Sequence, residues 1–177
     1  MKILETERLI LRHLLPADLE DLYALYRDPE IRRYFPEGTL TLQETKEELD
    51  WHRNGHPTHP QLGLWATIHK PSQRFIGRCG LLPWTIDEHL EVEVAYLLDR
   101  EFWNQGLATE AAQAIVQYAF NQLGYTRLIC LIDPANTASQ RVAEKIGMTL
   151  EKAVDGIAGD NFPTLIYAFF KDGKAIQ

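Results

Sequence analysis

The chain has 177 residues, of which 45% are hydrophobic and 24% are charged, so it can bury the core of one domain and is too apolar for wholesale disorder. The formal net charge of −7 makes a nucleic-acid surface an unlikely main feature, and an anionic ligand would need local backbone geometry to hold it. No apolar run approaches the roughly 18 residues of a membrane span, and the charged start MKILETERLILR does not resemble a signal peptide. Cys79 and Cys130 lie in apolar contexts, which predicts buried thiols in a soluble cytoplasmic protein.

The first part of the chain predicts one strand and two helices. Residue periodicity and turn signals give a strand over 7–15, a helix from Pro16 to a stop at Asp28-Pro29, a helix over 42–53 and a loop over 54–60. Thr41 and Glu44 have the spacing of a capping box, which predicts where the second helix begins.

The remainder of the chain predicts mainly strands, with two more helices. The expected elements are strands over 63–69, 74–82 and 89–99, a helix from Gly106 to Leu123 with Gly124 as its cap, a strand over 126–133, a helix over 136–146 closed by Gly147, and strands over 148–154 and 164–170. Hairpins and at least one βαβ crossover together predict an α+β (mixed α/β) domain spanning residues 1–177. Its centre is a mostly antiparallel mixed sheet of about six to seven strands with helices on both faces.

The stretch that opens the long apolar helix is NQGLAT, and Gly106 within it allows two interpretations. A glycine near a helix start can be a simple N-cap or a close-packing site, and the alanine-rich run behind it can be an ordinary buried helix. Alternatively, the first amides of the helix have no helical acceptor, so small residues such as Ala108 and the hydroxyl of Thr109 would let them bind a phosphate.

The same region carries a resemblance to a known family. It resembles the acetyl-CoA-binding motif of the GNAT N-acetyltransferase superfamily in the stretch EVEVAYLLDREFWNQGLATEAAQAIVQYAF, most of all the ribosomal-protein N-terminal acetyltransferase (RimJ/RimL-type) branch. Further pieces follow in the order of that branch, namely TERLILR with a Pro-Ala-Asp helix, Asn136-Thr-Ala-Ser139, Lys145-Ile-Gly147-Met148 and PTLIYAFF. The resemblance covers nearly the whole chain and implies a single GNAT domain that uses acetyl-CoA as co-substrate.

The resemblance also implies a mechanism, in which a primary amine attacks the thioester directly in a ternary complex. Glu93 matches the position of a general base that acts through water, and Ser139 is the candidate hydrogen-bond donor to the leaving thiolate. The structural alternatives stay open, because Glu91 and Glu93 can both decorate a solvent face of the sheet and Ser139 can be a helix-surface serine.

Cofactor-binding residues follow from the resemblance as well. They are Tyr96, Leu97, Leu98, Trp103, Asn104, Gln105, Gly106, Leu107, Ala108, Thr109, Asn136, Ser139 and Lys145. The backbones of Leu97 and Leu98 would pair with the pantetheine arm as with an extra strand, and Asn136 is also expected to be an N-cap. Trp103 departs from the superfamily pattern, which commonly has Arg or Gln three residues before the glycine, so the backbone amides would have to bind more of the diphosphate.

Other interpretations remain beside the enzyme. The chain could be an acyl-CoA-binding sensor without catalysis, or a nucleotide-binding module, although the Lys-Ser/Thr pair of a P-loop is missing. No metal site is expected, because His52, His56 and His59 match no zinc spacing and no cysteine joins them. Trp84 is expected in a loop after its strand, where it could face the acceptor. The acceptor would be a small-molecule amine or a protein N-terminus, with a homodimer implied by the resemblance and no nucleic-acid or membrane partner.

Overall fold

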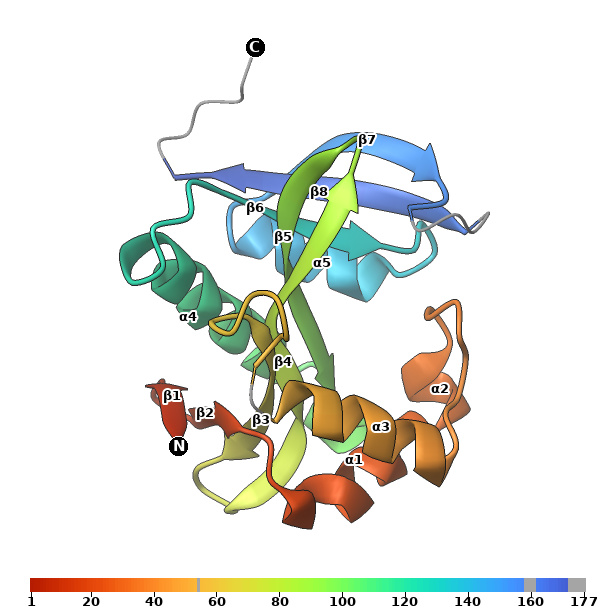
Figure 1. Cartoon of the computed structure of the whole chain (residues 1–177), viewed down its shortest axis with the longest axis vertical. Coiled ribbons are helices and arrows are strands. Elements are labelled where there is room, and N and C mark those ends of the chain that lie inside the picture. The colour runs from red at the N-terminus through yellow and green to blue at the C-terminus, as the bar shows by residue number, and fades with distance from the viewer. Residues whose placement is uncertain (54, 158–161, 172–177) are drawn as a thin grey trace.

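The computed structural model describes residues 1–53, 55–157 and 162–171 (Figure 1). The elements are β1 (Lys2–Glu5), β2 (Leu9–His13), α1 (Leu19–Tyr26), α2 (Pro29–Arg32), α3 (Leu42–His52), β3 (Gly63–His69), β4 (Arg74–Ile86), β5 (His89–Leu98), α4 (Leu107–Asn121), β6 (Arg127–Ile132), α5 (Thr137–Lys145), β7 (Thr149–Asp155) and β8 (Pro163–Phe170), with 3-10 helices at Pro16–Asp18 and Arg100–Phe102. The mixed α/β fold with helices on both faces of one sheet is therefore confirmed.

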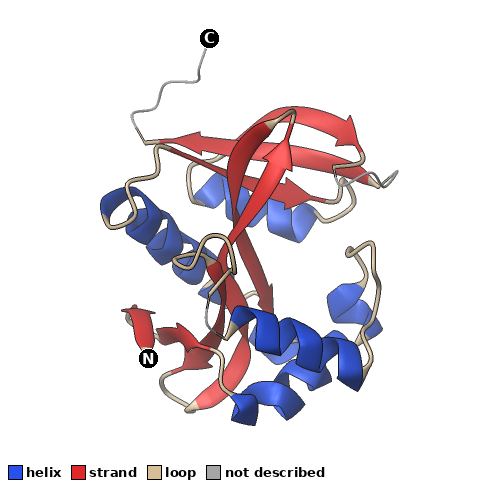
Figure 2. Ribbon diagram, viewed as in Figure 1, coloured by secondary structure: helices blue, strands red, loops and turns tan. Residues whose placement is uncertain are grey.

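The strands form one sheet in the order β1-β2-β3-β4-β5-β6-β8-β7. In the described part of the chain it has eight strands, more than the six to seven expected, because the short polar strand β1 shows little alternation and pairs with β2. All neighbours are antiparallel except β5 and β6, which are joined through α4 as the expected βαβ crossover. Figures 1 and 2 show β6, β8 and β7 crossing the upper end of the β4–β5 pair.

The α1 helix ends near the expected stop, but Asp28-Pro29 also begins a helix. The Oδ1 atom of Asp28 accepts hydrogen bonds from the amides of Glu30 at 2.8 Å and Ile31 at 3.4 Å. Pro29 is then the first residue of α2, where its missing N–H costs nothing because that group has no helical acceptor. The predicted stop is confirmed, but the short helix α2 was not predicted, because the dipeptide that ends one helix also caps the next.

The predicted caps of the longer helices are confirmed. Thr41 and Glu44 form the reciprocal capping box of α3. Gly124 has φ = 77° after the end of α4, and Gly147 has φ = 95° after α5, which are left-handed conformations that glycine adopts easily.

The β4 strand runs four residues beyond its predicted end at Leu82. Pro83 pairs with Val92 in the middle of the β4–β5 ladder. Proline is tolerated there because β3 begins only at Gly63, which pairs with Leu81. Beyond Leu81, β4 therefore has no neighbour on that edge that needs an N–H from it. Trp84 consequently lies on the strand opposite Glu91, and not in a loop as expected.

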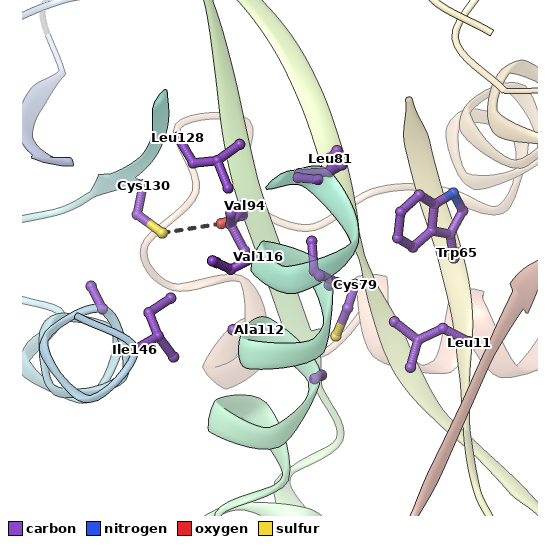
Figure 3. Close-up of a cluster of buried hydrophobic side chains, with 14 of the residues drawn as sticks. Leu11, Trp65, Cys79, Leu81, Val94, Ala112, Val116, Leu128, Cys130 and Ile146 are labelled. Carbon is purple, nitrogen blue, oxygen red and sulfur yellow. Dashed lines mark hydrogen bonds between the residues drawn. The ribbon is translucent and has the colours of Figure 1, made fainter. Parts of the chain in front are cut away.

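The buried apolar side chains form two larger cores, one on each face of the sheet, and a small third cluster of Ile129, Ile166 and Ala168 on β6 and β8. The larger core packs α4 and α5 on one face, with Cys79, Val94, Ala112 and Ile146 among its side chains (Figure 3). A second core, which includes Leu22, packs α1 and α3 against the other face. The long apolar stretch of α4 is therefore a buried helix, and it holds its own N-terminus rigidly beside β5. Among the described helices, none is long and apolar enough to cross a membrane.

Candidate active site and coenzyme cleft

The loop before α4 presents unused backbone amides. Gly106 is the N-cap of α4 with φ = 77°, and Asn104 has φ = 59°. The first helical hydrogen bond runs from the amide of Glu110 to the carbonyl of Gly106 at 3.0 Å. Within the described residues, the amides of Leu107, Ala108 and Thr109 have no acceptor. Such a turn concentrates positive partial charge and suits an anion.

The backbone conformation at Gly106 is a second reason, beside the small size of the residue, why this position favours a glycine. A side chain at φ = 77° is strained, so any replacement would disturb the loop as well as fill space. A bulky β-branched residue at this position would therefore lower stability as well as block the approach of an anion.

A cleft of about 390 Å³ opens beside this loop. It is lined by Glu7, Arg8, Gly106, Thr109, Glu110, Gln113 and Lys145. Three of the predicted cofactor residues, Gly106, Thr109 and Lys145, are thus brought to one surface although they come from two helices. Leu107 and Ala108 turn their side chains toward the core and offer only their amides.

Sequence reasoning missed Arg8 at this cleft. Its Nη1 atom donates to the carbonyl oxygen of Gln105 at 2.9 Å, and its Nε atom donates to Glu110 at 2.6 Å. Although partial burial opposes the change, hydrogen bonds from Thr6 and Arg8 lower the pKa of Glu110, which stays ionised. The only sequence signal for Arg8 is its place in the TERLILR motif, which lies about a hundred residues away from the loop that it contacts.

Trp103 supports the loop from the other side. Its indole Nε1 donates to the carbonyl oxygen of Leu98 at 2.8 Å, and the side chain is otherwise 43% exposed. The tryptophan therefore ties the loop to the end of β5 and places no cation at the loop.

The β5 strand has an unpaired edge beyond Glu93. Its ladder with β6 consists of the single pair Glu93–Ile129, and the carbonyl of Val94 accepts a hydrogen bond from Cys130 Sγ at 3.2 Å (Figure 3). Beyond this pair, β5 has no further ladder partner on the β6 side among the described residues, so that edge can accept an extended ligand arm as an added strand.

The register separates the two leucines that were predicted to bind such an arm. The carbonyl of Leu97 points at β4, where a side-chain carbon built on Gly77 would lie only 2.1 Å from it. Because the N–H and C=O of one residue face the same neighbour in an antiparallel pair, those of Tyr96 and Leu98 face the β6 side. The register thus favours Tyr96 over Leu97 for backbone pairing. Of the two backbone groups of Leu98, the carbonyl already accepts from Trp103 Nε1, which leaves the N–H.

Glu93 lies at the start of this unpaired edge. Its Oε2 atom accepts a hydrogen bond from Trp84 Nε1 at 2.7 Å. Glu93 is half-buried, and the desolvation of its carboxyl group raises its pKa. The Trp84 hydrogen bond and the positive charge of Arg78 act in the opposite direction and limit the rise. A buried carboxyl with a raised pKa is typical of a proton acceptor in a functional site.

Glu91 has a different environment from Glu93. Both its carboxylate oxygens lie 3.0 Å from Arg127 Nε, and Arg127 also forms a two-pronged ion pair with Glu151 on β7. This network joins β5, β6 and β7, so the contacts of Glu91 are structural.

Ser139 lies in the first turn of α5 and is held from both sides. Its amide donates to the side chain of Asn136 at 3.1 Å, which confirms Asn136 as the N-cap. Its Oγ atom lies 2.9 Å from the hydroxyl of Tyr96, which also donates to the Ser139 carbonyl at 3.0 Å. Tyr96 thereby links the unpaired edge of β5 to α5.

The histidine cluster and the cysteines have structural surroundings. His52 is buried, its Nδ1 accepts from the amide of Leu64 at 3.3 Å, and burial lowers its pKa to about 4. His56 and His59 form an isolated bridge, and no group of three potential ligands in the described ranges could hold a metal ion. Burial raises the pKa of both Cys79 and Cys130, so neither is a thiolate nucleophile.

Comparisons with known proteins agree with this geometry. The family model of the acetyltransferase (GNAT) domain matches residues 8–149. The Bacillus subtilis (strain 168) protein YkkB is 35% identical over 152 residues, which cover 85% of this chain and 87% of YkkB. The crystal structure of a GNAT-family acetyltransferase from Bacillus anthracis matches with a TM-score of 0.82 at 26% identity, covering 97% of this chain and 99% of that one.

A more distant structure shares the fold. Spermidine N-acetyltransferase from Vibrio cholerae, solved in complex with CoA and spermine, has a TM-score of 0.75 at 18% identity, covering 95% of this chain and 98% of that one. Since the family match spans most of the sequence, the chain belongs to the GNAT acetyltransferase family and is an acetyl-CoA-dependent acyltransferase.

Proposed function

We propose that this protein transfers the acetyl group of acetyl-CoA to a primary amine by direct attack in a ternary complex. The observation that carries the proposal is the arrangement at the unpaired edge of β5. The carboxyl of Glu93 lies where β5 leaves β6, and Tyr96, three residues later, contacts Ser139 on α5. A base and a hydrogen-bond donor are thus fixed to one short segment of strand.

The coenzyme fits the surfaces on either side of this edge. Three unused amides at the start of α4 and the adjoining cleft suit the diphosphate and the nucleotide end of CoA. The edge formed by the backbone of Tyr96 and the N–H of Leu98 suits the amide groups of the pantetheine arm, which would pair with it as an added strand. Asn136 and Lys145 stay predicted contacts on the α5 side.

Glu93 would act as the general base. Nucleophilic attack needs an uncharged amine, so the proton of the ammonium passes to the Glu93 carboxylate, directly or through one water. Because burial raises the pKa of Glu93, its carboxylate is a stronger base than an exposed one. The nitrogen then bonds to the acetyl carbon and the carbon–sulfur bond breaks, while the second proton lost by the nitrogen ends on the leaving thiolate to give free CoA.

Ser139 would assist the departure of the sulfur. A hydroxyl directed at the developing thiolate stabilises its charge, and the hydrogen bond to Tyr96 fixes the Oγ atom in place. In the part of the chain that the structure describes, α5 carries no tyrosine for this task.

The chemistry of the site requires a primary amine as the acceptor but does not select among amines. A related fold from Vibrio cholerae was solved with CoA and spermine, so polyamines belong in a screen beside amino acids and peptide N-termini. The competing proposal is an acyl-CoA sensor, in which the same surfaces bind the coenzyme without turnover.

One experiment separates the enzyme from the sensor. Acetyl-CoA is mixed with the protein and a panel of polyamines, amino acids and short peptides, and free thiol is measured, while CoA affinity is titrated in parallel. We expect amine-dependent thiol release that Glu93→Gln strongly reduces and Glu91→Gln does not. Tight CoA binding with no thiol release from the whole panel would favour the sensor.

A further inference from the structure

Arg8 occupies the rim of the coenzyme cleft opposite the helix amides. It follows the short strand β1 and reaches α4 through three contacts, from its backbone amide and Nε to Glu110 and from Nη1 to the carbonyl of Gln105. Its Nη2 atom has no hydrogen-bond partner in the ranges that the structure describes. A side-chain carbon built on Gly106 would lie 3.6 Å from that Nη2, so the unused end of the guanidinium stands over the glycine of the amide turn.

Arg8 neutralises a negative charge beside this turn. Glu110 is in the first turn of α4, and hydrogen bonds keep its pKa low, so it places a negative charge beside amides that suit an anion. Uncompensated, that charge would oppose a phosphate. The ion pair between Arg8 Nε and Glu110 at 2.6 Å cancels it, and both N–H groups of Nη2 are still available to donate.

Trp103 explains why the cation comes from so far away in the sequence. It lies three residues before Gly106, and its indole N–H is already used by the carbonyl of Leu98, so it offers the loop neither a charge nor a free donor. The residues that line the cleft include two cations, Arg8 and Lys145. Of these, Arg8 contacts the loop itself, whereas Lys145 is the last residue of α5.

We propose that Arg8 is a coenzyme-binding residue, whose Nη2 group donates to the diphosphate of CoA and replaces the side chain that Trp103 does not supply. This inference rests on the proposed binding of the diphosphate at the N-terminus of α4. It assigns to the N-terminal strands a direct part in coenzyme recognition, beyond closing the sheet.

Calorimetric titration with three ligands tests the assignment. CoA carries the diphosphate and a 3′-phosphate, 3′-dephospho-CoA keeps only the diphosphate, and pantetheine has no phosphate. We expect Arg8→Gln to weaken CoA and dephospho-CoA alike by about tenfold, the usual scale for one charge-assisted hydrogen bond, and to leave pantetheine unchanged. The loss should shrink at high salt, which screens a half-exposed charge.

Arg53→Gln is the matched control. Arg53 is 40% exposed and pairs with Asp50, much as Arg8 is 39% exposed and pairs with Glu110, but it lies after α3. Arg53→Gln should leave the affinities for CoA, dephospho-CoA and pantetheine unchanged. An effect of Arg8→Gln on CoA alone would assign Arg8 to the 3′-phosphate, and an equal loss with pantetheine would make Arg8 a purely structural residue. Either result overturns the proposal.

A second variant reverses the expected sign. Glu110→Gln removes the negative charge and leaves the guanidinium of Arg8 unneutralised, so CoA should bind more tightly, and this arm decides the matter even where Arg8→Gln does not fold. Weaker binding in Glu110→Gln would show that the pair only shapes the loop. If the wild-type protein binds pantetheine as tightly as CoA, the placement of the diphosphate fails and the proposed function must be revised with it.

Discussion

The hydroxyl of Tyr96 lies 2.9 Å from the Oγ atom of Ser139 and ties the unpaired edge of β5 to the first turn of α5. Burial raises the pKa of Tyr96 well above its ordinary value, so the phenol stays protonated throughout the working pH range. The phenol has a single proton, and when that proton is directed at the Oγ atom instead of the Ser139 carbonyl, it holds the serine oxygen in one place and leaves the serine proton available for a leaving sulfur.

Tyr96→Phe should therefore lower kcat by about tenfold, the effect of one lost hydrogen bond that positions a reacting group. Phenylalanine fills the same space, so the KM for the amine should stay unchanged. Ser139→Ala should lower kcat as well, and the double variant should lose no more than Ser139→Ala alone, because the tyrosine acts through the serine. Losses that multiply in a steady-state kinetic cycle would disprove this coupling.

Glu93→Gln should reduce turnover most at low pH. Without a base, the reaction depends on the uncharged fraction of the amine, which rises tenfold per pH unit below the pKa of the amine. We expect a loss of about 100-fold in the acidic range, which narrows as the pH approaches the amine pKa. A pH–rate profile parallel to that of the wild-type protein would remove Glu93 as the base.

Glu91→Gln is the internal control for this measurement. It changes the same residue type on the same strand, two positions away, but Glu91 is bound to Arg127 in the network that joins three strands. It should leave the shape of the pH–rate profile unchanged and affect mainly thermal stability. An equally altered profile would mean that the two carboxylates act together.

The same Glu93→Gln variant should be more stable than the wild-type protein at neutral pH. The pKa of Glu93 is raised above its ordinary value of 4.5 in the folded state, so its ionisation opposes folding once the pH exceeds the unfolded value. Glutamine does not titrate. The difference in Tm between variant and wild type should be small near pH 4 and grow as the pH rises through the folded pKa. A difference that falls with pH would mean that the carboxylate is stabilised in the folded protein.

Trp84→Phe should move the acidic limb of the pH–rate profile to higher pH. The indole N–H donates to Glu93 and lowers the pKa of its carboxyl, so its removal raises that pKa. Activity should fall at low pH and recover on the plateau. Trp51→Phe, at a side chain that is 55% exposed, is the control and should leave the profile in place. A shift to lower pH would contradict the role of Trp84.

Local signals in the sequence predicted much of this structure. The capping box of Thr41 and Glu44 and the left-handed Gly124 involve residues a few positions apart, so their chemistry can be read directly from the order of residues. The crossover through α4 also followed from local periodicity. The amide turn at Gly106 was one of two interpretations of the local residues, the resemblance to a family favoured it, and the structure added its left-handed conformation.

Contacts between distant segments could not be read in this way. Arg8 and Glu110 are 102 residues apart, and only the pairing of β1 with β2 beside α4 brings them together. The hydrogen bond from Trp84 to Glu93 depends on β4 continuing past Pro83. The proline is allowed there because the pairing of β3 with β4 does not extend beyond Leu81. A proline read by itself favours a strand end, so the local signal pointed away from the true arrangement.

The two glycines at the ends of α4 give a final test that separates backbone strain from ligand binding. Gly106 and Gly124 both have φ = 77°. A side-chain carbon at Gly124 meets nothing within 4 Å, and one at Gly106 meets only Arg8 at an ordinary contact distance. Alanine at either position should therefore lower the free energy of unfolding by about 1 kcal/mol, the cost of a left-handed alanine.

Only Gly106→Ala should weaken CoA binding, by about tenfold, because it turns the amides of α4 away from the diphosphate. Thermal melts and CoA titrations of both variants measure the two effects separately. Equal CoA affinities in the two variants would mean that the amide turn does not bind the coenzyme.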